Sequence, residues 1–275
     1  MRIRPQILYC SILLISLATG VASAQNAGAS SGYPVAQGKL TEPEHRGKGL
    51  YRRYCVGCHG VRGDGNGENA PYLDPKPRDF TQATFKCRST ASGSLPLDSD
   101  LYATITRGIH ASGMPSWNPL PSRDRSDLIA YIKTFSPRFH EEQPGPALPI
   151  PAEPPASAES TQHGAAVFQD MNCWSCHGKD GRGNGPSAHT LTDSRGYPIT
   201  PYDLTTGSRF KCGESDRDLF RDLMTGLDGT PMPSFTDALK PDQLWDVVHY
   251  IRSLQTNHGQ DGEAAMVGSK TETGK

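Results

Sequence analysis

Two copies of one short motif bring together residue types that could do chemistry. The motif is Cys55-Val56-Gly57-Cys58-His59 in the first copy and Cys173-Trp174-Ser175-Cys176-His177 in the second. Two cysteines at this spacing lie near one helical turn, so each thiol can form a thioether with one vinyl group of a c-type haem. The adjacent histidine then lies under the iron as an axial ligand. We therefore predict that the four cysteines, Cys55, Cys58, Cys173 and Cys176, bind the cofactor and that His59 and His177 are metal ligands.

Closely spaced cysteines have two other common functions, and the sequence favours neither of them here. A thioredoxin-like redox pair needs a βαβ context, and no segment shows convincing strand alternation. A zinc site needs four ligands in one cluster, whereas the two motifs are 118 residues apart. The duplicated motif thus favours two covalently attached haem c groups.

Two methionines are the candidates for the second axial ligand of each iron. Met114 follows His59 by 55 residues, and Met232 follows His177 by the same interval. A methionine thioether favours Fe(II) and raises the reduction potential of a haem. The alternative is that both are core residues, which is the more common place for methionine. Their matched offsets favour iron ligation.

The repeat extends beyond the motifs and predicts two domains. Gly65-Asn66-Gly67 recurs as Gly183-Asn184-Gly185, and Met114-Pro115-Ser116-Trp117 recurs as Met232-Pro233-Ser234-Phe235, both shifted by 118 residues. The proline-rich segment between the copies favours an extended, semi-rigid spacer rather than a packed element. The expected boundaries are a signal peptide 1–24, a polar N-terminal tail 25–43, a first domain 44–140, a Pro-rich linker 141–160, a second domain 161–257 and a polar C-terminal tail 258–275.

Apolar residues at helical intervals predict that both domains are all-α. One such set closes each domain, with members Leu128, Ile129, Ile132 and Phe135 in the first and Leu244, Val247, Val248 and Ile251 in the second. Gly108 should end a middle helix in the first domain, and Ser215 and Gly226 should cap the two ends of its counterpart in the second. A further helix should lead into each Cys-His motif.

The N-terminal residues predict export. Arg2 and Arg4 precede a short apolar stretch, and Val21-Ala22-Ser23-Ala24 offers a cleavage site, which is typical of a secretory signal peptide. A retained N-terminal anchor is the alternative. We expect a periplasmic or otherwise exported protein with no transmembrane segment in the mature chain. With 28 basic and 29 acidic residues, the chain lacks the basic excess of a nucleic-acid-binding protein.

In these motifs the chain resembles a tandem dihaem member of the class I cytochrome c family. The resemblance covers about residues 45–137 and 162–256. It implies two cytochrome c-like domains, each wrapping one covalent haem with His/Met coordination, and electron-carrier activity. In this family a proline about a dozen residues after the motif histidine often supplies a carbonyl that orients the imidazole. Pro71 stands at that place in the first domain. In the second domain His189 stands there instead, with Pro186 three residues earlier, and a plain surface position is the favoured interpretation of His189.

Cys87 and Cys212 are equivalent in the repeat but lie outside the haem motifs, and three interpretations of them remain open. They could form a disulfide, as exported thiols tend to do. They could be small buried residues near each haem. They could also be thiolate ligands that displace methionine and lower the potential. Four cations near them could pair with haem propionates, although charged residues of this kind are usually solvated: Lys86, Arg88, Arg209 and Lys211.

Together these features favour an exported dihaem cytochrome that carries single electrons between redox partner proteins. Its slight acidic excess suits a transient, polar contact with a basic patch on a partner. A dihaem oxidoreductase, peroxidase-like or acting on a sulfur compound, is the alternative, because a cysteine ligand would allow such chemistry. A third hypothesis is an electron-transfer subunit of a larger complex, including association with a membrane-bound redox complex. Sequence alone does not separate this hypothesis from the first.

Overall fold

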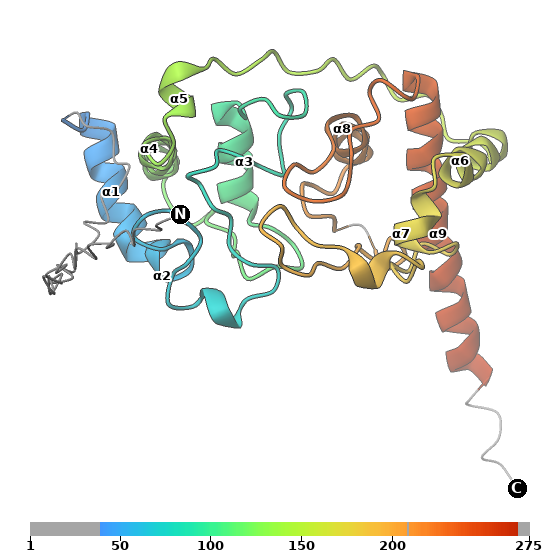
Figure 1. Ribbon diagram of the computed structural model, residues 1–275. Coiled ribbons are helices and arrows are strands. Elements are labelled where there is room, and N and C mark those ends of the chain that lie inside the picture. Colours follow the sequence, from blue (N-terminus) through green and yellow to red (C-terminus); the bar gives the residue numbers. More distant parts are fainter. Residues whose placement is uncertain (1–38, 208, 269–275) are drawn as a thin grey trace, which may run out of the picture. The chain divides into compact units, whose positions relative to one another are not determined.

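The computed structural model describes residues 39–207 and 209–268, and within these ranges the regular structure is helical (Figure 1). Two isolated bridges, Thr192 with Pro198 and Phe210 with Gly213, are the only β pairing in this part of the chain. The fold is therefore all-α, as the sequence predicts. The predicted signal peptide 1–24 and most of the predicted N-terminal tail lie outside the described residues.

The helices fall into two modules that repeat one arrangement. The first module contains α1 (Glu42–Tyr54), α2 (Val56–His59), the 3-10 helix η1 (Ala70–Tyr72), α3 (Asp98–Arg107), α4 (Ser122–Lys133) and α5 (Arg138–Glu141). The second contains α6 (Ala158–Asp170), α7 (Cys173–His177), the 3-10 helix η2 (Ala188–Thr190), α8 (Asp216–Thr225) and α9 (Pro241–Gly268). Gly108 ends α3, while Ser215 and Gly226 cap the two ends of α8, as predicted.

In each module two helices pack at close range, and one glycine allows this. Gly47 of α1 lies against α4, where a Cβ would come within 1.9 Å of the Asp127 carbonyl oxygen. Gly164 of α6 lies against α9 in the same way, with 1.9 Å to the Asp246 carbonyl oxygen. A side chain at either position would push the helices apart, so glycine sets the distance at which they pack.

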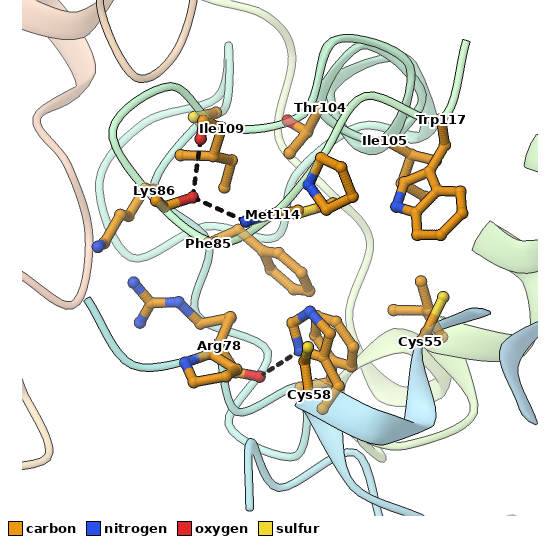
Figure 2. Close-up of a pocket in the computed structure, with 18 of the residues that line it drawn as sticks. Cys55, Cys58, Arg78, Phe85, Lys86, Thr104, Ile105, Ile109, Met114 and Trp117 are labelled. Atoms are coloured by element: carbon orange, nitrogen blue, oxygen red, sulfur yellow. Dashed lines mark hydrogen bonds between the residues drawn. The ribbon is translucent and has the colours of Figure 1, made fainter. Parts of the chain in front are cut away.

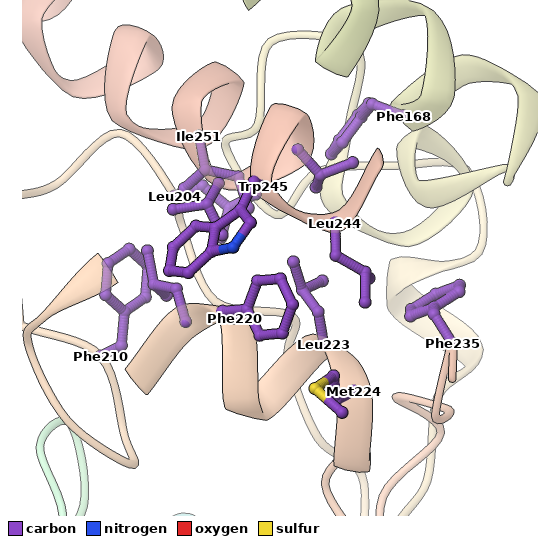
Figure 3. Packing of buried hydrophobic residues seen from close by; sticks show 13 residues of the cluster. Phe168, Leu204, Phe210, Phe220, Leu223, Met224, Phe235, Leu244, Trp245 and Ile251 are labelled. Atoms are coloured by element: carbon purple, nitrogen blue, oxygen red, sulfur yellow. The ribbon is translucent and has the colours of Figure 1, made fainter. Parts of the chain in front are cut away.

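Each module has its own hydrophobic core. In the first, the buried ring of Tyr51 packs edge-on against Phe80 and Tyr131. In the second, Figure 3 shows Phe220 of α8 facing Trp245 of α9, with 4.4 Å between the ring centroids. The two apolar faces predicted near the end of each domain, which belong to α4 and α9, are buried in these cores.

The proline-rich segment between α5 and α6 is extended, but it contacts both modules. No helix forms between Glu142 and Ser157. The Leu148 N–H donates to the Ser89 carbonyl of the first module at 2.8 Å, and the side chains of Leu148 and Ile150 pack against the core of the second. The sequence predicted a spacer that does not pack, and it did not take Leu148 and Ile150 into account. Alternate residues of an extended chain share one face, so these two side chains point to the same side.

A disulfide joins the two modules and resolves the three interpretations of its cysteines. Cys87 and Cys212 are bonded to each other, with 5.1 Å between their Cα atoms. Next to the bond, the fully buried side chain of Arg88 forms an ion pair with Asp228 of the second module at 2.9 Å. A buried cation is stable only when it is paired, so this contact favours one arrangement of the modules.

The last helix continues past the predicted end of the second domain. The backbone of α9 remains helical to Gly268, within the segment that was expected to be a polar tail. Among the helices that the structure describes, none combines the length and the apolar character needed to cross a membrane.

Candidate haem sites

Each Cys-x-x-Cys-His motif follows directly on a long helix and is held by a glycine loop. Helix α1 leads into α2, and α6 leads into α7. The loop after each motif then folds back on it: the Gly65 N–H donates to the His59 carbonyl at 3.0 Å, and the Gly183 N–H donates to the His177 carbonyl at 2.7 Å. Both glycines have φ of +74°, a left-handed conformation that other residues rarely adopt.

A backbone carbonyl orients each motif histidine. His59 Nδ1 lies 3.0 Å from the Arg78 carbonyl oxygen, and His177 Nδ1 lies 3.1 Å from that of Tyr202. Donation by the Nδ1–H leaves the Nε2 lone pair free for a metal. Burial lowers the pKa of both imidazoles in spite of these bonds, which favours the neutral form that binds iron. Phe80 also stacks on His59, with 4.4 Å between ring centroids.

These carbonyls are not the ones that the family resemblance suggested. Pro71 lies in η1, where its carbonyl accepts a hydrogen bond from Lys76 Nζ at 3.0 Å, and His189 is an exposed residue of η2. The exposed position of His189 is the favoured one, but the expectation for Pro71 was wrong, because it counted residues from the histidine whereas the loop length varies. The orienting residues follow Pro77 and Pro201, which stand 18 and 24 residues after the two histidines.

A second repeat in the sequence could have identified the orienting residues. Residues 77–81 and 201–205 share the pattern Pro-x-Asp-x-Thr, with the orienting residue at the second position. The fourth residue of each segment donates its N–H to the glycine loop: Phe80 to the Gly63 carbonyl and Leu204 to the Gly181 carbonyl, both at 2.7 Å. This segment therefore links the motif loop to the histidine in both modules.

The methionine loops are also built alike. The backbone N–H of Met114 donates to the Ser112 hydroxyl at 3.2 Å (Figure 2). The backbone N–H of Met232 donates to the Thr230 hydroxyl at the same distance. Gly108, which ends α3, lets this loop approach closely, because a Cβ there would come within 2.6 Å of the Pro115 carbonyl carbon. The glycine that ends α8 makes the equivalent approach in the second module.

The predicted residues of each site come together around one cavity. The first cavity is lined by Cys55, Cys58, His59 and Met114 (Figure 2). The second is lined by Cys173, Cys176, His177 and Met232. Trp117 and Phe235, the aromatic residues that follow the two methionines, also line these cavities. Imidazole nitrogen, thioether sulfur, two thiols and apolar walls fit a covalently bound haem.

The cations near the disulfide differ in what they can contribute. Arg88 pairs with Asp228, and the exposed Arg209 lies 3.7 Å from Glu214. Lys86 lines both cavities, and Lys211 lines the second. Of these four cations, only the two lysines line a haem cavity.

The motif thiols also have properties expected before haem attachment. Burial raises the pKa of Cys55 to about 12 and that of Cys173 to about 11, so both are protonated at neutral pH in the haem-free chain.

Within the described residues no group of three or more His, Cys, Asp or Glu side chains gathers that could hold a metal ion. The zinc alternative thus has no ligand set in this part of the chain.

Comparisons with known proteins place both modules in one class. Residues 161–255 match the cytochrome c family, and residues 42–132 match the family described as cytochrome c oxidase, cbb3-type, subunit III. A solved chain of the Kuenenia stuttgartiensis reducing HAO-like protein complex Kustc0457/Kustc0458 is 40% identical, with a TM-score of 0.75. That match covers 78% of this chain and 97% of the other. No curated protein sequence matches this one.

An all-α fold with two Cys-x-x-Cys-His cavities defines a c-type cytochrome. The chain belongs to the tandem dihaem class I cytochromes c, and it carries two covalently bound haem c groups. Electron transfer is the function that such cytochrome c domains indicate.

Proposed function

We propose that this protein is an exported dihaem electron carrier, with His59 and Met114 as the axial ligands of one iron and His177 and Met232 as those of the other. The observation that supports it most is that each cavity is lined by both motif thiols, a carbonyl-bound imidazole and a methionine. When bound, haem supplies one-electron chemistry by cycling between Fe(III) and Fe(II). Because a histidine and a methionine of the chain would hold each iron, no substrate would need to bind there.

The cysteine pairing also favours a carrier over an enzyme. The oxidoreductase alternative depended on Cys87 or Cys212 as a reactive thiolate ligand, and these two sulfurs are bonded to each other. A disulfide sulfur carries no thiolate charge, so it is a poor competitor for Fe(III). Methionine is then the soft ligand left at each site.

We further propose that the carrier acts as the electron-transfer subunit of a larger redox complex. The support is its similarity, over 97% of the other chain, to a component of a reducing HAO-like protein complex. Export is supported by the signal-peptide pattern of residues 1–24. The donor and the acceptor would be redox proteins that contact the carrier transiently or within the complex.

Carbon monoxide binding to the reduced protein tests the proposed function. If both axial positions are filled at each iron, carbon monoxide should leave the visible spectrum of both haems unchanged, and hydrogen peroxide should not be turned over. Met114→Ala is the positive control, because it opens one position and should allow carbon monoxide to bind at one haem. Binding to the unaltered protein would contradict a closed carrier and favour a dihaem oxidoreductase.

A further inference from the structure

The two haem cavities share part of their wall. Pro75 and Lys86 line both cavities, although both residues belong to the first module. Asp74 and Ala111, also from the first module, line the second cavity. The second site is therefore completed by the first module, and a charge at the shared wall lies close to both sites.

Lys86 supplies such a charge, and no protein group neutralises it directly. Its Nζ has no hydrogen bond or ion pair with any residue that the structure describes. Burial and the neighbouring cations Arg78 and Lys211 lower the pKa of Lys86 to about 8, and only the charge of Asp193 opposes them. Figure 2 shows the charged ends of Lys86 and Arg78 pointing the same way, away from Met114.

Carboxylates act on these lysines only at longer range: Asp193 on Lys86 and Asp74 on Lys211, neither with a hydrogen bond or ion pair among the described residues. Lys86 and Lys211 are partly buried, and a charge withdrawn from water is costly unless an opposite charge lies nearby. Each haem carries two propionate carboxylates, which are anions of the right kind for these cavities. Their binding would remove the repulsion between Lys86, Arg78 and Lys211 and raise the pKa of the lysines toward ordinary values.

Lys211 is the structural counterpart of Lys86 and offers a matched comparison. The two lysines immediately precede Cys87 and Cys212, the two halves of the disulfide. Burial lowers the pKa of Lys211 as well. The difference is that Lys211 lines only the second cavity, whereas Lys86 lines both.

We propose that Lys86 is a positioning residue shared by the two haem sites: its ammonium group neutralises propionate carboxylate at the common wall and raises both reduction potentials. The inference rests on the proposed function, because it needs a haem in each cavity. A fixed positive charge in a weakly screening interior favours the reduced haem, which carries one more electron than the oxidised haem. The disulfide and the Arg88–Asp228 pair hold the modules so that one lysine can serve both sites.

The test compares Lys86→Met with Lys211→Met in the haem-loaded, full-length protein by optical redox titration. Loss of one unit charge near a haem in the protein interior should change its reduction equilibrium on the order of tenfold, which is about 59 mV for one electron. We expect both haem transitions to shift to lower potential in Lys86→Met and only one to shift in Lys211→Met. Lys86→Arg should restore both potentials, since it keeps the charge.

The visible spectrum separates the ways in which this test can fail. If Lys86→Met retains two methionine-ligated haems but shifts one transition or none, the shared role of Lys86 is overturned. If Lys86→Met does not load haem, Lys86→Gln keeps a polar end and must give the same pair of shifts. If the unaltered protein lacks methionine-ligated haem, the proposed function fails, and this inference fails with it.

Discussion

At the residue scale, the two proposed ligands of the first haem iron depend on different supports. His59 is held from one side by the Arg78 carbonyl, while Met114 is held by a loop that includes the Ser112 hydroxyl. The hydrogen bonds that hold His59 and those that hold the Met114 loop have no partner in common. The methionine can therefore be replaced without disturbing the histidine, which allows the contribution of the sulfur to be measured on its own.

Met114→Ala should lower one of the two reduction potentials and leave the other unchanged. Loss of the thioether removes the ligand that favours Fe(II), so we expect a fall on the order of 0.1–0.3 V, within the roughly 0.8 V over which axial ligands set haem potentials. Optical redox titration of the purified protein measures both transitions. Met224→Ala, in the buried core of the second module, should lower stability but neither potential. Two unchanged potentials in Met114→Ala would show that Met114 is not a ligand.

At the scale of the elements, the packing of α1 against α4 fixes where the first haem motif begins. Helix α1 leads directly into α2, so any shift of α1 moves Cys55, Cys58 and His59 as a unit. The contact depends on Gly47, where α1 meets the backbone of α4. The equivalent contact at Gly164 controls the second motif through α6 and α9.

Gly47→Ala and Gly49→Ala should have opposite effects on stability, although both add one methyl group to α1. A Cβ at Gly47 would overlap the α4 backbone, so we expect a loss of roughly 1–3 kcal/mol or more in the free energy of unfolding. A Cβ at Gly49 meets nothing within 4 Å, and alanine there should add about 0.5–1 kcal/mol through helix propensity. Urea denaturation of the haem-loaded protein measures both changes. Equal effects from the two substitutions would rule out the close contact.

The sequence predicted the helices and the haem motifs because both depend on local patterns. The apolar periodicity of Leu244 to Ile251 and the capping residues Ser215 and Gly226 act within a few residues of chain. The Pro-rich linker and the carbonyl partner of His59 depend on loops that fold back over longer distances. The linker sequence by itself does not show that Leu148 and Ile150 pack against the core of the second module. Pro71 was predicted as the carbonyl partner of His59 from its distance along the sequence. The actual partner, Arg78, reaches His59 because its loop folds back over the motif.

At the scale of the whole molecule, a disulfide and a buried ion pair are among the links that hold the two modules together. The Cys87–Cys212 disulfide closes a separation of 125 residues, and the Arg88–Asp228 pair lies beside it. Sequence showed that the two cysteines were equivalent, but it did not show their pairing, because that depends on how the modules meet. The same contact between modules creates the wall that both haem cavities share.

Replacing Cys87 and Cys212 together with alanine should lower stability without changing the iron ligands of either haem. The chain-entropy estimate for a loop longer than 100 residues is about 4–5 kcal/mol, so we expect a loss of roughly that size in the free energy of unfolding. Denaturant titration followed by circular dichroism measures the loss, and the visible spectrum serves as the control. A spectrum showing a change of iron ligand at either haem would indicate that one of these sulfurs acts at iron.

The most direct test of the central claim is near-infrared magnetic circular dichroism of the fully oxidised, unaltered protein, with the signal expressed per chain. This method distinguishes pairs of axial ligands on low-spin haem by the energies of their charge-transfer bands. We predict two His/Met haems in every chain. Bands of bis-histidine, thiolate or high-spin haem at either site, or only one His/Met haem per chain, would contradict it.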